Sequence, residues 1–233
     1  MIHLDSDLRL SETITFLSKW VRVAQSLNLD CCLVDNTLQL PKLREVIPGS
    51  LQANVLLLSA PPVDEDLLQV GGAGIGEILS MKFALAQLKL NPKDLIFKSN
   101  ARYFVRNMET IVELTNPEVP INFFTYGLVC RAETKFFAIS AEHFAKFIEF
   151  AEPLMNKSSN LHLEHLFAQY IAGPGYLYSS HFRVPPVLEG KSGRFGTEYS
   201  FISESRINHL TFKLFKSFRK FSIGVSSTKQ SKS

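Results

Sequence analysis

Short runs of apolar residues, each bordered by polar ones, most constrain what this chain can fold into. Three such runs lie at residues 31–34, 54–59 and 94–98. Longer segments with helical periodicity separate them. A strand that is apolar on both sides must be covered on both sides, and alternation with helices is typical of a parallel sheet. The sequence therefore predicts one α/β domain, a mostly parallel twisted sheet flanked by helices. Ligands are then expected beyond the carboxyl ends of the strands.

The helical segments can be bounded by their capping and stop signals. Ser11 is expected to cap a helix that runs to Leu27, and Asn91-Pro92 are expected to stop a helix that begins at Glu77. The long segment near the C-terminus is rich in Gly, Pro and Tyr, as binding loops often are. The other expected elements are strands at 122–130 and 136–140, helices at 141–155 and 161–171, and loops at 61–76 and 173–199.

The C-terminal segment differs from the rest in charge. From Glu204 onward there are seven Lys and Arg against one acid, whereas the whole chain has a formal net charge of +3. Residues 204–222 place Leu and Phe on one helical face and basic side chains on the other, which predicts a helix that binds an anionic membrane surface. The alternative is a helix whose Phe face packs on the domain. Because the aromatic residues lie opposite the cations, nucleic acid is not the expected partner.

Composition and the N-terminus indicate where the protein works. Hydrophobic residues make up 45% and charged residues 20%, as in ordinary globular proteins. Of the three cysteines, Cys31 and Cys32 lie in an apolar run and are expected to be buried thiols in a reducing compartment. No signal peptide or transmembrane helix is predicted. We therefore expect a cytoplasmic domain at 1–203, a basic amphipathic helix at 204–222 that could hold it on the inner membrane, and a disordered tail at 223–233.

Three segments have compositions suited to phosphate binding. Residues 71–77 are Gly-rich and precede a predicted helix, although their spacing does not match a dinucleotide-binding fingerprint. Residues 98–107 follow an apolar strand, and their Lys and Arg could neutralise a diphosphate. Residues 189–194 imitate the end of a P-loop, but Pro185 stands where that motif requires glycine, so we reject it. The ordinary alternatives are a flexible turn, a solvated strand end and a basic loop.

Two further segments bear on acid–base and metal chemistry. His162 and His165 could share a helix face around a metal, but without further ligands surface positions are favoured. Glu164 between them could serve as a base or bind an acceptor. The Asp-Glu-Asp at residues 64–66 resembles a DxD metal motif, but it lies in a polar loop, and we favour a solvated acidic turn. No metal ligand is assigned, and dependence on a divalent metal stays open.

Taken in order, these segments resemble a family of small bacterial glycosyltransferases from capsule and lipopolysaccharide clusters. The resemblance implies a glycosyltransferase A (GT-A) fold that transfers sugar from a nucleotide-activated donor to a surface polysaccharide or lipid-linked glycan. It covers residues 9–200 in scattered blocks. The matching blocks are LVDNT from Leu33, GGAGIGEILSMKFAL from Gly71, FKSNARYFVRN from Phe97, Glu164 in a later helix, and PPVLEGKSGRFG from Pro185.

The resemblance also implies roles for individual residues. Glu77 or Glu164 would act as the catalytic base or hold the acceptor. The leaving diphosphate requires positive charge in the transition state, which Lys and Arg would supply. The residues expected to contact the donor nucleotide and its phosphates are Asp35, Asn36, Gly74, Gly76, Lys98, Arg102, Asn107, Lys191 and Ser192.

The sequence departs from the family pattern at three points. Ala101 stands where the family has glycine, Lys98-Ser99-Asn100 replaces a DxD, and a short segment precedes the first helix in place of a strand. Ala101 and the short N-terminal segment are the reasons for keeping an alternative, a non-catalytic transferase-like binding or scaffold subunit of a polysaccharide assembly complex. A nucleotidyltransferase would share the α/β fold, but it needs a Gly-rich loop directly after the first strand, which this sequence lacks.

Overall fold

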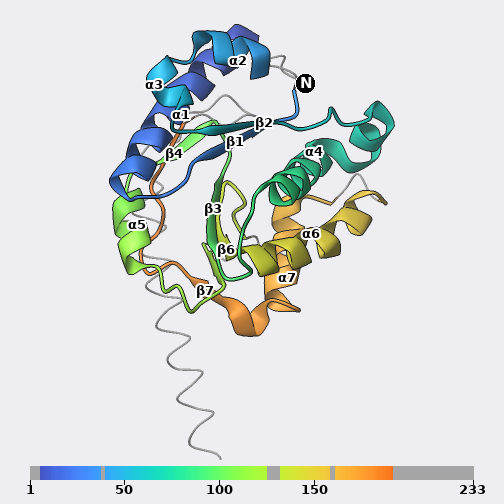
Figure 1. The fold of residues 1–233 in the computed structure, drawn as a ribbon. Coiled ribbons are helices and arrows are strands. Elements are labelled where there is room, and N and C mark those ends of the chain that lie inside the picture. The colour runs from blue at the N-terminus through green and yellow to red at the C-terminus, as the bar shows by residue number, and fades with distance from the viewer. Residues whose placement is uncertain (1–5, 38–39, 125–131, 158–160, 191–233) are drawn as a thin grey trace, which may run out of the picture.

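The structure is a computed structural model that describes residues 6–37, 40–124, 132–157 and 161–190. The expected helix at 204–222 and tail at 223–233 lie outside these residues. Figure 1 shows helices on both sides of a set of strands. The helices are α1 (Ser6–Ser26), α2 (Leu40–Val46), α3 (Gly49–Gln52), α4 (Glu65–Gln87), α5 (Met108–Leu114), α6 (Ala141–Met155), α7 (Leu163–Ala172) and a 3-10 turn, η1 (Tyr176–Tyr178). The strands are β1 (Cys32–Asp35), β2 (Leu56–Ser59), β3 (Leu95–Ser99), β4 (Tyr103–Val105), β5 (Ile121–Phe123), β6 (Phe136–Ser140), β7 (Ser179–His181) and β8 (Leu188–Gly190).

The α/β class is confirmed, but the prediction of a mostly parallel sheet is wrong. The described strands form a four-stranded sheet in the order β3-β6-β5-β7 and two pairs, β1-β2 and β4-β8. The pairings β1–β2 and β5–β7 are parallel, whereas β3–β6, β5–β6 and β4–β8 are antiparallel. Apolar strands require cover on both sides whichever way they run, so composition could not reveal strand direction.

Strand β6 is buried along its whole length and separates two of the three hydrophobic clusters formed by the described residues. Phe137 and Ile139 belong to one hydrophobic cluster, while Phe136 and Ala138 belong to another. Successive side chains of a strand point to opposite sides, so both sides of the sheet are covered at this strand. The first cluster is covered by α4, α6 and α7, and the second by α1 and α5.

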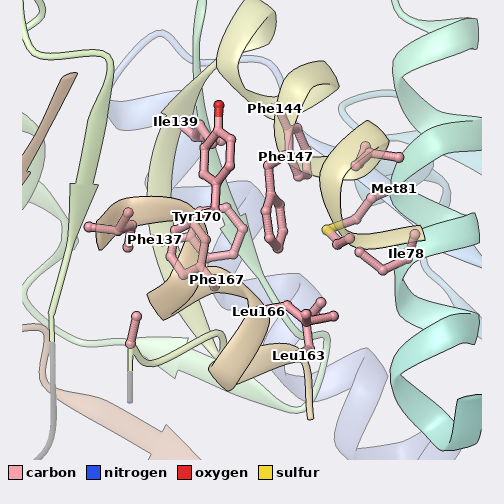
Figure 2. Packing of buried hydrophobic residues seen from close by; sticks show 14 of the residues in the cluster. Ile78, Met81, Phe137, Ile139, Phe144, Phe147, Leu163, Leu166, Phe167 and Tyr170 are labelled. Carbon is pink, nitrogen blue, oxygen red and sulfur yellow. The ribbon is translucent and has the colours of Figure 1, made fainter. Parts of the chain in front are cut away.

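The first cluster is built from aromatic rings. The ring of Phe137 lies 4.5 Å from that of Phe167 and 6.0 Å from that of Phe144, centroid to centroid. Phe147 lies 5.0 Å from Phe167 and 5.5 Å from Tyr170. Figure 2 shows these rings beside α6, α7 and the sheet. In the same view, Ile78 and Met81 extend from α4 towards the rings. Several of the 19 phenylalanines of the chain thus pack α6 and α7 against β6.

Several predicted boundaries need correction. Ser11 does not cap the first helix, because α1 begins before it and the Ser11 carbonyl accepts a hydrogen bond from Thr15 Oγ1 inside the helix. The strand predicted at 122–130 is represented by the short β5, and residues 125–131 lie outside the description. The predicted loop from residue 173 contains η1, β7 and β8 within its described part. In contrast, the helix predicted at 141–155 is confirmed at both ends, with Ser140 as its cap.

The two described cysteines are less buried than the expectation of buried thiols requires. Cys31 and Cys32 are free and half-buried. Burial raises the pKa of each thiol to about 11, so both are protonated at neutral pH. No helix in the described part of the chain is long and apolar enough to cross a membrane.

The two-sided core predicts a large difference between two leucines. Leu166 is fully buried in the first cluster, whereas Leu177 in η1 is exposed. Leu166→Ala should lower the free energy of unfolding by about 3 kcal/mol, because it leaves a cavity among the rings. Leu177→Ala, the same chemical change, should alter it by no more than about 0.5 kcal/mol. Urea denaturation followed by far-UV circular dichroism measures both, and equal effects would contradict this core.

Candidate functional site

Helix α4 begins before the Gly-rich stretch and consists of two helical segments that meet at Gly72, which corrects the predicted loop at 61–76 and the predicted helix start at Glu77. Helix α4 begins twelve residues earlier, with Asp64 as its cap accepting a hydrogen bond from the Asp66 amide at 2.8 Å. The helix is kinked at Gly72, where φ is 62° and ψ is −160°. Glycine adopts this non-helical conformation readily, so α4 consists of two helical segments joined at Gly72.

Close packing explains two of the other glycines. A Cβ on Gly71 would lie 3.1 Å from the Met155 carbonyl oxygen, and one on Gly74 would lie 2.5 Å from the Met155 Cε. Both positions therefore let α4 approach the end of α6. A Cβ on Gly76 would lie 3.2 Å from Asn36 Nδ2, so this glycine faces a candidate site residue. Phosphate binding by Gly74 and Gly76 stays a prediction.

Asp35 and Asn36 lie at the carboxyl end of β1 and hold neighbouring helices. Asp35 Oδ1 accepts a hydrogen bond from the Thr37 amide at 3.0 Å, and Oδ2 accepts one from the Leu40 amide at 2.9 Å, so Asp35 fixes the start of α2. Asn36 Nδ2 donates to the Gly76 carbonyl at 3.1 Å. The strand end expected to contact the donor is therefore tied directly to α4, one residue before Glu77.

Glu77 and Lys98 form the charged centre of the site. The Lys98 ammonium pairs with Glu77 Oε1 and also donates to Asn100 Oδ1 at 2.5 Å and to the Thr134 carbonyl at 2.7 Å. It lies 5.6 Å from the centroid of the Phe137 ring. The two side chains are 10% and 27% exposed, for Lys98 and Glu77 respectively. Removing one partner of such a partly desolvated pair leaves the other charge without compensation, and the contact joins α4 to β3.

Thr134 connects this pair to the second predicted carboxylate. Its hydroxyl donates to Glu164 Oε1 at 3.2 Å, while its carbonyl accepts from Lys98. Thr134 is buried, and it lies just before β6, whereas Glu164 is in the first turn of α7. Sequence reasoning missed Thr134. The available signal was the polar Glu133-Thr134-Lys135 run directly before the apolar residues that begin β6.

The side chains of Glu77, Lys98 and Glu164 together carry a formal net negative charge. Two carboxylates, of Glu77 and Glu164, accompany one ammonium, of Lys98. Lys135, nearby in sequence, is paired with Glu133, at 2.8 Å between Nζ and Oε2. A diphosphate at this place would therefore need further positive charge. Among the described residues, no group of three or more His, Cys, Asp or Glu side chains is arranged to hold a metal ion.

Two other predicted blocks meet through β4 and β8. Tyr103 is paired with Gly190, and the Asn107 side chain holds the chain before β8, donating to the Pro185 carbonyl at 3.0 Å and accepting from the Val187 amide at 2.8 Å. Gly190 has a φ of 142°, and a Cβ there would lie 2.3 Å from the Arg102 carbonyl oxygen. The block around Arg102 therefore lies against the block that ends at Gly190. Lys191 and Ser192 follow Gly190 in sequence and lie outside the described residues.

The structure thus brings together candidates that are far apart in sequence. Hydrogen bonds and an ion pair link Asn36 to Gly76, Glu77 to Lys98, and Lys98 through Thr134 to Glu164. His162 precedes α7, and its ring centroid lies 5.6 Å from that of His165. The acidic residues 64–66 are exposed at the start of α4, as expected for a solvated acidic turn.

Comparison with known proteins adds no assignment. The sequence matches no protein-family model and no curated protein. The function must therefore be argued from the residues and their arrangement.

The central ion pair predicts energetic coupling between its two residues. Glu77→Gln should lower the free energy of unfolding by about 2 kcal/mol, because a partly buried ammonium loses its charged acceptor. In a double-mutant cycle with Lys98→Met, the two substitutions should be non-additive by a similar amount. Glu142→Gln, which breaks the exposed pair with Lys146, is the matched control and should leave stability unchanged. Additive effects of Glu77→Gln and Lys98→Met would contradict the pairing.

The contact between β4 and β8 predicts that Gly190 cannot be replaced. Gly190→Ala should destabilise the protein by about 3 kcal/mol, because alanine is strained at this φ and its methyl group would overlap the Arg102 carbonyl. Gly49→Ala is the control, since a Cβ at Gly49 has no neighbour within 4 Å and the residue lies in helix α3. It should be neutral or stabilise by about 0.5 kcal/mol. Thermal denaturation compares the two variants, and similar melting temperatures would refute this placement of β8.

Proposed function

We propose that the protein is a glycosyltransferase of the GT-A type that transfers a sugar from a nucleotide-activated donor to a surface polysaccharide or lipid-linked acceptor. The observation that carries the proposal is the contact chain from Asn36 through Glu77, Lys98 and Thr134 to Glu164. These residues come from separate elements and include the two proposed carboxylates and the central cation. Polar side chains gathered at strand ends of an α/β domain are the usual position of a ligand site.

Lys98 is proposed to bind the donor diphosphate by exchanging partners. In the structure its ammonium pairs with Glu77, at a side chain only 10% exposed. A donor phosphate could replace that carboxylate as the anionic partner and free Glu77 at the same time. Because the Glu77, Glu164 and Lys98 group is net negative, we assign Arg102 and Lys191 to supply further positive charge to the leaving diphosphate. A divalent metal is the other source of such charge.

Glu77 or Glu164 is proposed to receive the proton of the acceptor hydroxyl. In the transfer, the hydroxyl oxygen bonds to the anomeric carbon of the sugar. The bond from that carbon to the diphosphate oxygen breaks, and its electron pair leaves with the nucleoside diphosphate. Glu164 is fixed by the Thr134 hydroxyl, whereas Glu77 becomes available when the donor takes its place at Lys98. This difference favours Glu77 as the base and Glu164 as the residue that holds the acceptor.

One observation favours the alternative of a non-catalytic binding or scaffold subunit. The Lys98 ammonium already has three partners, from Glu77, Asn100 and Thr134, and Asn107 has two backbone partners. Such satisfied groups also suit a purely structural role. The two functions differ in turnover, so they can be separated by experiment.

Donor binding should raise the melting temperature of the purified protein. A nucleotide sugar at a hundred times its Kd adds about 2.7 kcal/mol to stability, which is several degrees for a chain of this size. A panel of UDP-, GDP- and CMP-linked sugars, with and without Mg²⁺ or Mn²⁺, tests this by thermal shift. Lys98→Met should abolish the shift, whereas Lys146→Met, at an exposed pair, should retain it.

Turnover decides between the two functions. Release of nucleoside diphosphate from the donor that gives a shift should fall at least a hundredfold in Glu77→Gln, the loss expected for a general base. A shift without turnover in the unsubstituted protein, with candidate acceptors present, would favour the binding subunit. No shift with any donor would reject the proposed glycosyltransferase.

A further inference from the structure

The turn η1 exposes three large side chains in succession. Tyr176, Leu177 and Tyr178 are 68%, 85% and 46% exposed. Within the described part of the chain, Leu177 and Tyr176 are the two most exposed large hydrophobic residues. Figure 1 shows this turn, in orange between α7 and β7, projecting from the end of the molecule. A projecting group of neighbouring apolar side chains differs from the single exposed ones found on most proteins.

The turn is held in this outward conformation by its own hydrogen bonds and by packing beneath it. The Gly175 amide donates to the Tyr170 carbonyl at 2.7 Å, and the Tyr178 amide donates to the Gly175 carbonyl at 3.0 Å. Gly175 also packs closely, since a Cβ there would lie 3.1 Å from Ile121 Cδ1. The ring of Tyr178 rests on that of His143, 4.5 Å between centroids. The fold therefore keeps the Tyr176 and Leu177 side chains in water.

The small exposed area and the uncharged side chains of the turn favour a lipid surface over a protein as its partner. A stable protein interface needs about 800 Å² from each partner, whereas three side chains on a convex turn offer far less. A lipid surface needs no matching groove, and Tyr beside Leu suits the boundary between headgroups and hydrocarbon. The nearest charges do not favour anionic headgroups, because Lys146 beside Tyr178 pairs with Glu142 and a second carboxylate, of Glu149, also acts on it. Attraction to charged headgroups is therefore not the source of binding at this turn.

We propose that the Tyr176–Tyr178 turn inserts into the outer part of a lipid bilayer. Leu177 enters the hydrocarbon, and the two tyrosines lie at the level of the headgroups. This contact is independent of sugar transfer. It also differs from the electrostatic binding expected of residues 204–222, because insertion of an uncharged turn is not weakened by salt.

The test measures binding of the full chain to phosphatidylcholine vesicles and to vesicles that also contain phosphatidylglycerol, at low and high salt. At high salt, Leu177→Glu should reduce binding by about tenfold, because a buried leucine is replaced by a charge. Val70→Glu makes a comparable change at an exposed apolar residue of α4 and should not reduce binding. Figure 1 shows α4 away from the turn between α7 and β7. Trp fluorescence of Leu177→Trp should shift to the blue and be quenched by brominated acyl chains.

Several outcomes would overturn the insertion. They are no vesicle binding by the unsubstituted chain, bound Leu177→Trp without quenching, and equal losses in Leu177→Glu and Val70→Glu. Self-association that Leu177→Glu abolishes, in a chain that does not bind vesicles, would assign the turn to contact with a second copy. Circular dichroism of each variant verifies that it is folded, as expected for substitutions at exposed positions.

Discussion

Burial of β6 on both sides is the constraint on which the other elements depend. Phe136 and Ala138 require cover on one side, and Phe137 and Ile139 require it on the other. Helices α1 and α5 cover Phe136 and Ala138, while α6 and α7 cover Phe137 and Ile139. Because β3 lies next to β6, the same burial places Lys98 over the Phe137 ring and Thr134 within hydrogen-bond reach of it.

The candidate site depends on how closely α4 approaches its neighbours. The absence of side chains at Gly71 and Gly74 allows α4 to lie against Met155 of α6, and Gly76 allows contact with Asn36. That approach puts Glu77 against Lys98. The Gly-rich stretch thus contributes to the site by positioning a carboxylate, a role that differs from the backbone contact with phosphate that its composition first suggests.

Much of the fold was predictable where the signal is local. The apolar runs located β1, β2, β3 and β6, and the helix predicted at 141–155 matches α6. The predicted start of α4 failed because a helical kink and a loop have the same glycine composition. Strands β4 and β8 were missed because each has three residues, too few for a period, and their pairing joins segments more than eighty residues apart. Among the site residues, Glu77, Lys98 and Glu164 were found from sequence and Thr134 was not.

The sequence by itself determined the α/β class, because helical periodicity and two-sided apolar strands can be recognised within short windows. The sequence also identified the candidate carboxylates, Glu77 and Glu164, and the lysine, Lys98, next to the predicted helices and strand. Only the tertiary structure decided strand direction and the partners of those charges. Direction depends on which distant strands pair, and the Glu77–Lys98 contact depends on a helix bend at Gly72 and close packing at Gly71 and Gly74. These are long-range contacts, and no local pattern of residues specifies them.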